Sequence, residues 1–264
     1  MQTIRISVIT VCYNAADTIV GTIESVLGQT YENLEYCIID GLSTDGTQEL
    51  IHHYEDNGKV KTLFEADSGL YNAMNKGIDL CSGEYVLFLN SGDVFADASV
   101  VSRAVEQMCR YREKKQVTAG GRMPDIFYGN VIRTYETKRV TEKYLGKHKV
   151  FQLLMMGKMP CHQSIFTSAP VLKKYKFDET YQICADFDFL VRCLRGGVAM
   201  QYIDVDISVV DCVMGISSQN ENLERMRMED DRSLRKQYPL CYAVIQPLKI
   251  IIRKCRNCYR YVGR

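Results

Sequence analysis

Short apolar runs alternate with segments of helical periodicity along the first 115 residues of the chain. Four of the runs predict buried strands, the first of them rich in β-branched residues: Ile4–Val11, Leu34–Asp40, Lys61–Glu65 and Glu84–Leu89. The segments between them have apolar residues at helical spacing and predict helices: Ala16–Leu27, a segment that ends near Tyr54, Leu70–Leu80 and Ser99–Lys114. This alternation is typical of an α/β fold, in which helices cover both faces of a parallel sheet.

The alternation loosens after about residue 116. Paired strands are predicted over Ile126–Tyr135 and Lys138–Tyr144. Two short strands and two helices follow: Ser164–Phe166, Phe187–Leu194, Gln201–Val205 and Asn222–Tyr238. We therefore divide the chain into an α/β half (1–115), a second half of the same domain (116–238) and a C-terminal segment (239–264).

The composition is that of an ordinary globular protein, because 46% of the 264 residues are hydrophobic and 25% are charged. The net charge of +1 argues against a protein that coats nucleic acid. No apolar run is long enough to cross a bilayer, and Arg5 and Ser7 interrupt the apolar stretch that a signal peptide would need. The 11 cysteines are odd in number and lack framework spacing, which predicts free thiols and a cytoplasmic location.

The C-terminal segment 239–264 has six basic residues and no acid, whereas the rest of the chain has 27 basic and 32 acidic residues. Its apolar residues recur at alternating spacings of four and three, which places them on one face of a helix: Cys241, Ile245, Leu248, Ile252, Cys255, Tyr259 and Val262. A cationic amphipathic helix is suited to the surface of an anionic membrane. The alternative is a helix that packs on its own domain and exposes a basic edge.

Polar side chains follow each of the first four predicted strands, and an open parallel sheet binds ligands beyond the carboxyl ends of its strands. In chain order they are Thr10, Tyr13 and Asn14; Asp40, Ser43, Thr44 and Asp45; Glu65 and Asp67; and Asn90 and Asp93. Such residues also favour ordinary turns. Four such loops in register nevertheless predict one shared site.

Three segments, taken in order, resemble glycosyltransferase family 2: SVITVCYNAADTIVGTIESVLGQTY, YCIIDGLSTDGT and GEYVLFLNSGD. The resemblance covers roughly residues 4–240, and residues 65–77 are similar to a bacterial subgroup that builds capsular and exopolysaccharides. It implies an inverting enzyme of the GT-A fold, with a mostly parallel, Rossmann-like sheet and C-terminal amphipathic helices. Residues 1–115 would then bind the nucleotide-sugar donor, and residues 116–238 a glycan or lipid-linked acceptor.

The resemblance assigns Asp40 to the nucleobase of the donor, with Thr10 and Tyr13 in the same pocket. A carboxylate accepts hydrogen bonds and uracil N3–H donates one, so UDP-sugars are favoured and GDP-sugars are an alternative. Further donor-binding candidates lie in the same motifs: Asn14, Asp67, Lys76, Asn90 and Ser91. Family members often have a second acid where this chain has Gly41. The alternatives are an Asx-turn for Asp40 and a solvated helix lysine for Lys76.

Residues Asn90–Asp93 occupy the place of the family's D-x-D-D metal motif. Only Asp93 retains a carboxylate there, and we expect it to bind Mg²⁺ or Mn²⁺, since these ions often take one or two carboxylates beside phosphate and water oxygens. His162 lies in a segment similar to a C-H-Q segment of the subgroup and is a second candidate near the metal or the diphosphate. The alternative for Asp93 is a turn residue after a strand.

Residues Ile183–Arg192 resemble the family's acceptor-side E-D motif, with Ala in place of the usual Glu. We expect Asp186 to be the general base that takes the proton of the acceptor hydroxyl, in a one-step displacement that inverts the anomeric carbon. Gln163 and Asp188 are expected on the acceptor side, and pairing with Arg192 is the alternative for Asp188. The alternative for Asp186 is a helix N-cap.

Other functions fit the sequence less well. A dinucleotide oxidoreductase would have G-x-G-x-x-G after the first strand, and a sugar-1-phosphate nucleotidyltransferase a glycine-rich basic loop, where this chain has Val11–Asn14. A catalytically inactive sugar-nucleotide-binding module is a further alternative, because Asn90, Gly92 and Ala185 stand at positions of family acids. The sequence thus predicts a cytoplasmic glycosyltransferase, peripheral at the cytoplasmic face of the inner membrane, that binds no nucleic acid.

Overall fold

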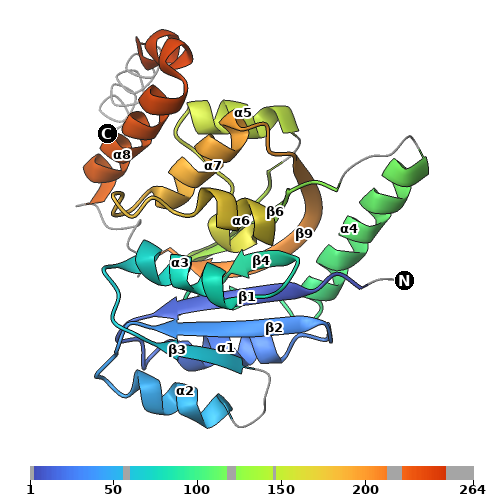
Figure 1. Ribbon diagram of the computed structural model, residues 1–264, viewed down its shortest axis with the longest axis vertical. Helices are drawn as coiled ribbons and strands as arrows, with labels where there is room; N and C mark the ends of the chain where they lie inside the picture. Colours follow the sequence, from blue (N-terminus) through green and yellow to red (C-terminus); the bar gives the residue numbers. More distant parts are fainter. Residues whose placement is uncertain (1–2, 56–59, 118–122, 145–146, 213–221, 248–264) are drawn as a thin grey trace.

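The structure, a computed structural model, describes residues 3–55, 60–117, 123–144, 147–212 and 222–247. Its centre is a nine-stranded sheet with the strand order β3-β2-β1-β4-β8-β6-β9-β5, and β7 pairs with β6 beside this path. Figure 1 shows helices on both sides of the sheet and the last described helix at the top of the view.

The first half of the sheet is parallel. It consists of β1 (Ile6–Cys12), β2 (Leu34–Asp40), β3 (Val60–Phe64) and β4 (Tyr85–Phe88). The four strand predictions are confirmed, each to within two residues. Cys12 pairs with Asp40, and Asp40 pairs with Phe64, so β1, β2 and β3 end at the same edge.

Helices cover both faces of this sheet, as predicted. One face is covered by α1 (Ile19–Leu27), α2 (Thr47–Glu55) and α4 (Val100–Val117). The other is covered by α3 (Leu70–Leu80), α6 (Ala169–Tyr175) and α7 (Ala185–Arg195). Along β1, Ile6 and Val8 pack on the first side, whereas Ile9 and Val11 pack on the second, because successive side chains of a strand point to opposite faces.

Beyond β4 the sheet is mixed. Its strands are β5 (Val94–Phe95), β6 (Ile126–Tyr135), β7 (Lys138–Glu142), β8 (Ile165–Ser168) and β9 (Met200–Asp211). β8 is antiparallel to both β4 and β6, and β7 is antiparallel to β6, as the predicted pair of strands requires. β9 runs parallel to β6 and antiparallel to β5. The second half therefore extends the same sheet and faces the carboxyl ends of the first.

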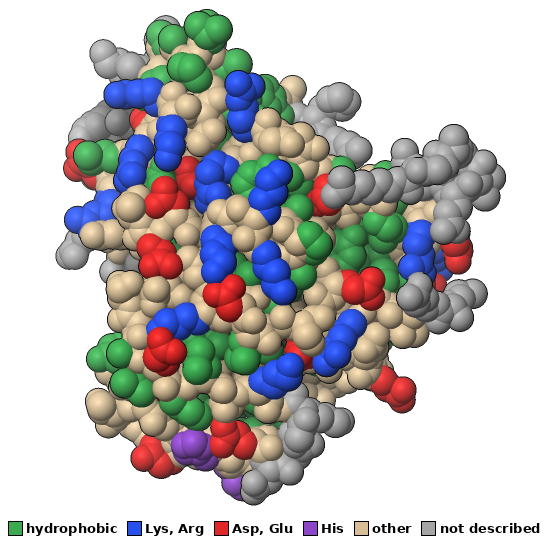
Figure 2. Space-filling view, in the orientation of Figure 1, with side chains coloured by type: hydrophobic (Ala, Val, Ile, Leu, Met, Phe, Trp, Pro, Cys, Tyr) green, Lys and Arg blue, Asp and Glu red, His purple; other side chains and the backbone are tan. Residues whose placement is uncertain are grey.

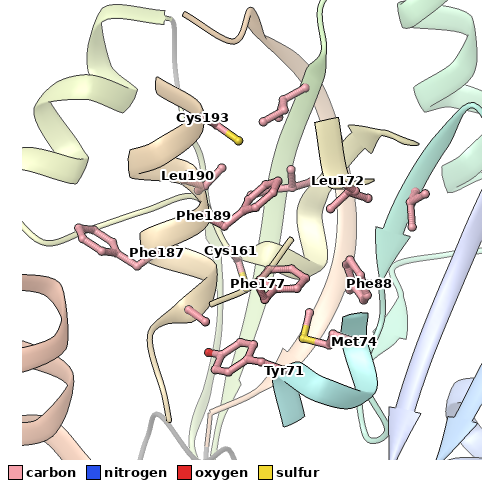
Figure 3. Packing of buried hydrophobic residues seen from close by; sticks show 14 of the residues in the cluster. Tyr71, Met74, Phe88, Cys161, Leu172, Phe177, Phe187, Phe189, Leu190 and Cys193 are labelled. Carbon is pink, nitrogen blue, oxygen red and sulfur yellow. The ribbon is translucent and has the colours of Figure 1, made fainter. Parts of the chain in front are cut away.

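An aromatic cluster fixes α7 on the sheet (Figure 3). The ring of Phe177 lies 5.7 Å from that of Tyr71 on α3, 5.4 Å from Phe88 on β4 and 5.3 Å from Phe189 on α7. All four side chains are buried or nearly so. Burial of one such ring stabilises the fold by roughly 1.5–3 kcal/mol, so the first turn of α7 is held firmly against the strand ends.

Helix α8 (Asn222–Gln237) packs on α7 mainly through polar contacts. The carboxylate of Glu229 accepts hydrogen bonds from three successive backbone N–H groups, those of residues 182–184, at 2.9–3.0 Å. Ser233 donates to the buried Asp188 at 2.8 Å. The loop that leads into α7 is thus tied to the C-terminal part of the chain. The remaining short elements are α5 (Lys147–Met155) and a 3₁₀ turn, η1 (His162–Ser164).

A further helix spans residues 239–247, the described part of the predicted tail helix. Cys241 and Ile245, two members of the predicted apolar stripe, pack against the domain core and do not face solvent as a free stripe. Leu240 and Val244 are exposed instead, by 83% and 70%. The alternative of a helix packed on its own domain therefore holds for this part, and the basic residues from Lys249 onward lie outside the described residues.

The nine cysteines in the described part of the chain are free, as the sequence predicted. Among the described helices, none has the length and apolar character needed to cross a membrane. The loop at residues 215–218, which resembles the segment before the family's last helix, lies outside the described residues.

Candidate active site

A cleft of about 690 Å³ opens beyond the carboxyl ends of β1 and β4, between the parallel half of the sheet and the first turn of α7. Most of the predicted site residues line it: Tyr13, Asn14, Asp67, Asn90, Ser91, Asp93, His162, Gln163 and Asp186. Four do not: Thr10, Asp40, Lys76 and Asp188. The structure thus gathers residues from both halves of the chain at one place, as the strand-end pattern predicted.

The loops after β1 and β2 are joined by hydrogen bonds. The backbone N–H of Asn14 donates to Ser43 Oγ at 2.8 Å, and the N–H of Thr44 donates to Asn14 Oδ1 at 3.0 Å. Asn14 has a φ of 47°, a left-handed conformation that asparagine adopts more readily than most residues. Asn14 therefore shapes one wall of the cleft and presents Tyr13, whose side chain is 63% exposed.

Asp40 and Thr10 lie beneath this wall and not in it. The Asp40 carboxylate is fully buried and accepts hydrogen bonds from the N–H and Oγ of Ser43, at 2.8 and 2.5 Å. Thr10 is also buried and donates to the carbonyl of Leu89 at 2.7 Å. The structure places both side chains outside the cleft lining, with their polar atoms hydrogen-bonded within the fold, and their contact with the nucleobase stays a prediction. Asp40 accepts the N–H three residues on, which caps the loop but is not the Asx-turn that was its alternative.

Asp67 lies directly against Gly41, the residue after Asp40. A Cβ atom at Gly41 would lie 2.4 Å from Asp67 Oδ2, so a larger residue at this position would displace the Asp67 carboxylate. Asp67 accepts a hydrogen bond from the N–H of Gly69 at 2.9 Å and lines the cleft. Lys76 lies outside the lining, because its ammonium group pairs with Glu65 at 2.8 Å and donates to a backbone carbonyl.

Asp93 is buried at the floor of the cleft, where its Oδ2 accepts a hydrogen bond from Gln163 Nε2 at 2.7 Å. Burial raises the pKa of the Asp93 carboxyl to about 6. Gln163, expected on the acceptor side, is thereby committed to Asp93. No three His, Cys, Asp or Glu side chains gather into a metal site within the described ranges. A single carboxylate still fits a Mg²⁺ or Mn²⁺ ion whose other ligands are diphosphate and water oxygens.

His162 bridges two walls of the cleft. Its Nδ1 lies 2.9 Å from Asp186 Oδ2, and its Nε2 lies 3.2 Å from Asn90 Nδ2. Both ring nitrogens thus have a polar neighbour, and a role of His162 near the metal or the diphosphate stays a prediction. Asp186 opens the first turn of α7, where its Oδ1 accepts the N–H of Phe187 at 2.8 Å and the hydroxyl of Tyr71 lies 3.4 Å away.

Asp188 has a structural role. Its carboxylate is fully buried, accepts a hydrogen bond from Arg192 Nε at 2.5 Å and another from Ser233. Asp188 lies on a different side of the helix from Asp186, because the two are two residues apart, and its contact with the acceptor stays a prediction. The alternative, pairing with Arg192, is the arrangement that the structure has.

Several cleft residues have no counterpart among the predicted ones. Arg133 on β6 and Lys158, after α5, bring positive charge to the lining. Tyr71 and Glu229 hold the loop before Asp186. Tyr71 lies on the apolar face of α3, where the sequence gives no functional signal. For Arg133 a signal was available in the sequence, because it is the one arginine in the predicted strand Ile126–Tyr135 and has polar neighbours.

Comparison with known proteins extends this picture. Over 236 residues the chain is 26% identical to a PGL/p-HBAD biosynthesis glycosyltransferase of Mycobacterium bovis, and the match covers 87% of this chain and 86% of that protein. Over 90 residues, 33% of this chain and 36% of the other, it is 41% identical to a Bacillus subtilis protein named for teichuronic acid biosynthesis.

Two solved structures are similar in fold. Staphylococcus aureus TarS 1-349 in complex with UDP-GlcNAc has a TM-score of 0.62 at 17% identity, covering 89% of this chain and 67% of that one. The mannosyltransferase PcManGT from Pyrobaculum calidifontis, in complex with GDP-Man and Mn²⁺, has a TM-score of 0.64 at 14% identity, covering 89% and 64%. The chain thus spans about two-thirds of these proteins and shares their GT-A fold.

A sequence model described as glycosyl transferase family 2 matches residues 7–166, which is more than half of the chain. The matched part contains nearly all of β1 to β4 and the strand-end loops that line one wall of the cleft. The chain therefore belongs to glycosyl transferase family 2.

Proposed function

We propose that the protein transfers a sugar, with inversion, from a nucleotide-diphosphate donor to a hydroxyl of a glycan or lipid-linked acceptor in the synthesis of a bacterial surface polysaccharide. The observation that carries this proposal is the cleft, which has Asp186 on one wall and the strand-end loops on the other. The donor is a UDP-sugar in preference to a GDP-sugar. Support comes from the TarS complex with UDP-GlcNAc and from the relative named for teichuronic acid biosynthesis.

Asp186 is the general base in this proposal. Its carboxylate takes the proton of the acceptor hydroxyl while the acceptor oxygen forms a bond to the anomeric carbon of the donor. The bond from that carbon to the diphosphate breaks in the same step, and the nucleoside diphosphate leaves with the electron pair. Attack opposite the leaving group inverts the anomeric carbon. The Glu of the family's motif is Ala185 here, so Asp186 is the acid of that motif that remains.

The donor half is assigned to residues 1–115 and the acceptor half to residues 116–238. Tyr13, Asn14 and Asp67 bind the nucleoside, and Ser91 the diphosphate, while Asp40 shapes the loop from below. Arg133 and Lys158 balance the diphosphate charge from the second half. Asp93 would hold Mg²⁺ or Mn²⁺, which when bound offsets negative charge on the leaving diphosphate.

The proposed location is the cytoplasmic face of the inner membrane, where lipid-linked acceptors lie. Leu240 and Val244 project from the helix at 239–247 one turn apart, so they share one face of it. Lys and Arg side chains gather on the upper part of the surface in Figure 2, over the region of α6 and α8 in Figure 1. An apolar edge beside basic side chains suits an anionic lipid surface.

Calorimetric titration with UDP and with GDP, each with and without Mn²⁺, tests the donor assignment. We expect micromolar binding of UDP that strengthens with Mn²⁺. Binding that ignores Mn²⁺ would remove the metal from the proposal. If neither nucleotide binds, the glycosyltransferase assignment fails. If UDP binds but no UDP-sugar is turned over, the chain is instead an inactive sugar-nucleotide-binding module, as the missing acids at Asn90, Gly92 and Ala185 would allow.

Substitution of Asp186 tests the base. Asp186→Asn keeps the size of the side chain and removes its ability to take a proton, so kcat for release of nucleotide from the donor falls by about 10²–10⁴. UDP binding stays as in the wild type, because the donor wall is unchanged. The exposed Asp79→Asn, which lies outside the cleft, serves as the matched control. Full activity of Asp186→Asn would remove Asp186 as the base.

A further inference from the structure

Three side chains form a hydrogen-bonded row across the cleft, from Asn90 through His162 to Asp186. The distances are 3.2 Å from Asn90 Nδ2 to His162 Nε2 and 2.9 Å from His162 Nδ1 to Asp186 Oδ2. Asn90 comes from the loop after β4, His162 from η1 and Asp186 from α7. The row therefore joins the position of the family's metal motif directly to the proposed base.

The row requires one particular tautomer of the imidazole. An ionised carboxylate only accepts hydrogen bonds, so the contact with Asp186 needs a proton on Nδ1. In the neutral ring Nε2 is then an acceptor and must face a donor, which the amide nitrogen of Asn90 supplies. The Asp186 carboxylate thus selects the tautomer with the proton on Nδ1, and Asn90 Nδ2 faces Nε2 as the donor that this tautomer accepts.

An acid at position 90 would reverse this selection. A carboxylate facing Nε2 needs a proton on that nitrogen, which in the neutral ring leaves the lone pair of Nδ1 directed at Asp186. The alternative, an imidazolium between two carboxylates, would hold Asp186 in a strong ion pair and weaken it as a base. The replacement of the family's acid by Asn90 therefore has a consequence for the acceptor side of the cleft.

We propose that Asn90 and His162 are positioning residues that fix the tautomer of His162 and thereby the orientation of the Asp186 carboxylate. The inference rests on the proposed function, in which Asp186 is the base. The backbone is held independently, because Phe187 N–H binds Asp186 Oδ1 and Glu229 binds the N–H groups of residues 182–184. What His162 adds is the direction of Oδ2.

The tautomer itself can be measured without any substrate. The chain has four histidines, so ¹⁵N-labelled protein gives few ring signals, and the spectrum of His162→Gln identifies those of His162. At pH 7.5 we expect a protonated Nδ1 and an unprotonated Nε2 in the wild type. In Asn90→Asp we expect a shift to protonated Nε2 or to the imidazolium. A wild type with Nε2 protonated, or no change in Asn90→Asp, would overturn the proposal.

A matched pair of substitutions tests the effect on Asp186. In His162→Asn the amide reaches the position of Nδ1 and can still donate to Asp186. In His162→Gln it reaches the position of Nε2 and keeps only the contact with Asn90. We expect His162→Gln to lower kcat for nucleotide release about 100-fold with little change in KM for the donor, because a displaced catalytic group costs rate and not donor binding. His162→Asn should retain most of the activity.

The exposed His53, in α2 and outside the cleft, provides the control variant His53→Asn. Equal losses in His162→Asn and His162→Gln would contradict the positioning role, as would a loss confined to KM. These results are separate from those for the proposed function. If the wild type turns over no donor, the proposed function fails, whereas the ring-nitrogen spectra still decide whether Asn90 sets the tautomer.

Discussion

Asp93 is an acid in a place where its ionised form is unfavourable. The side chain is 8% exposed, and its only described side-chain partner is the neutral amide of Gln163. Burial without a cation raises the pKa of the Asp93 carboxyl to about 6. Acids with a pKa raised by burial are characteristic of functional sites, where they lower the stability of the fold but are needed for the reaction or for binding. A cation that arrives with the donor would restore the ionised form.

The loss of folding stability caused by the ionised Asp93 can be measured in the protein without donor or metal. The pKa of Asp93 is about 6 when folded and near 3.8 when unfolded, so the unfolded state binds fewer protons between these values and stability falls as the pH rises from 3.8 through 6. Asp93→Asn keeps an acceptor for Gln163 and removes the charge. We expect a gain in the free energy of unfolding of up to about 3 kcal/mol at pH 7.5, which vanishes near pH 4.

Urea unfolding at pH 4 and at pH 7.5 checks this prediction, with the exposed Asp17→Asn as the control. The same Asp93→Asn variant should lose any effect of Mn²⁺ on UDP binding. An Asp93→Asn protein that is less stable than the wild type at pH 7.5 would show that the carboxylate is stabilised by partners other than Gln163.

Residue types and strand ends predicted most of the side chains that line the cleft, but not the direction in which each one points. Asp40 and Asp93 both follow strands of the parallel sheet, yet only Asp93 lines the cleft, because Ser43 binds both oxygens of Asp40. The local sequence also favoured Asp188 as an acceptor residue. In the structure its carboxylate is buried and binds Ser233 on α8 and Arg192 on α7. Contacts such as the one between Ser233 and Asp188 join segments that are far apart in the chain, so a local sequence pattern cannot predict them.

At the scale of elements, Glu35 joins the strands that carry the donor wall. Its carboxylate on β2 accepts hydrogen bonds from Ser7 on β1, from Lys61 on β3 at 2.6 Å and from the N–H of Ser82 at 2.7 Å. Burial alone would raise the pKa of Glu35, but these hydrogen bonds lower it to about 2. One buried acid thus ties three neighbouring strands and the end of α3 together.

Glu35→Gln should weaken this junction. The pKa of Glu35 is lower when folded than when unfolded, so its contribution is present above about pH 4.5 and is lost as the pH falls toward 2. We expect Glu35→Gln to lower the free energy of unfolding at pH 7 by about 2–3 kcal/mol, with the difference from the wild type shrinking below pH 4.5. The exposed Glu32→Gln on the preceding loop is the control, and an unchanged midpoint in urea for Glu35→Gln would contradict the assignment.

Elements were predictable where their signals are local. β2 and α3 have the predicted bounds, because each is a short apolar or amphipathic run between turn residues. β9 extends well past the predicted Gln201–Val205, because Asp204 and Asp206 interrupt the apolar run although Ile207 continues the alternation. The two-residue β5 and the seven-residue α6 are too short to show a period. The order of strands beyond β4 depends on pairings between distant segments.

On the scale of the whole molecule, charge and apolar exposure are unevenly distributed. Figure 2 shows Lys and Arg side chains concentrated on the upper part of one face and hydrophobic side chains at its top, where Figure 1 places the last described helix. Basic residues close both α6, with Lys173 and Lys174, and α8, with Arg235 and Lys236. In the same region Glu229 binds the loop that precedes Asp186. A surface that met the membrane here would lie next to the acceptor side of the cleft.

Sedimentation with lipid vesicles tests this surface. We expect the full chain to bind vesicles that contain phosphatidylglycerol and not neutral phosphatidylcholine vesicles, with binding that weakens as salt is added, because basic residues contribute about 1 kcal/mol each at an anionic surface. The double variant Leu240→Ser, Val244→Ser removes the two exposed apolar side chains. Partial burial of each contributes roughly 1 kcal/mol, so the double variant should weaken binding about 30-fold. Val140→Ser, at an exposed apolar position on β7, is the control.

If the double variant binds as the wild type does, this helix is not the membrane contact. If the wild type binds neither kind of vesicle, the peripheral location is wrong, and the acceptor must then reach the cleft from solution.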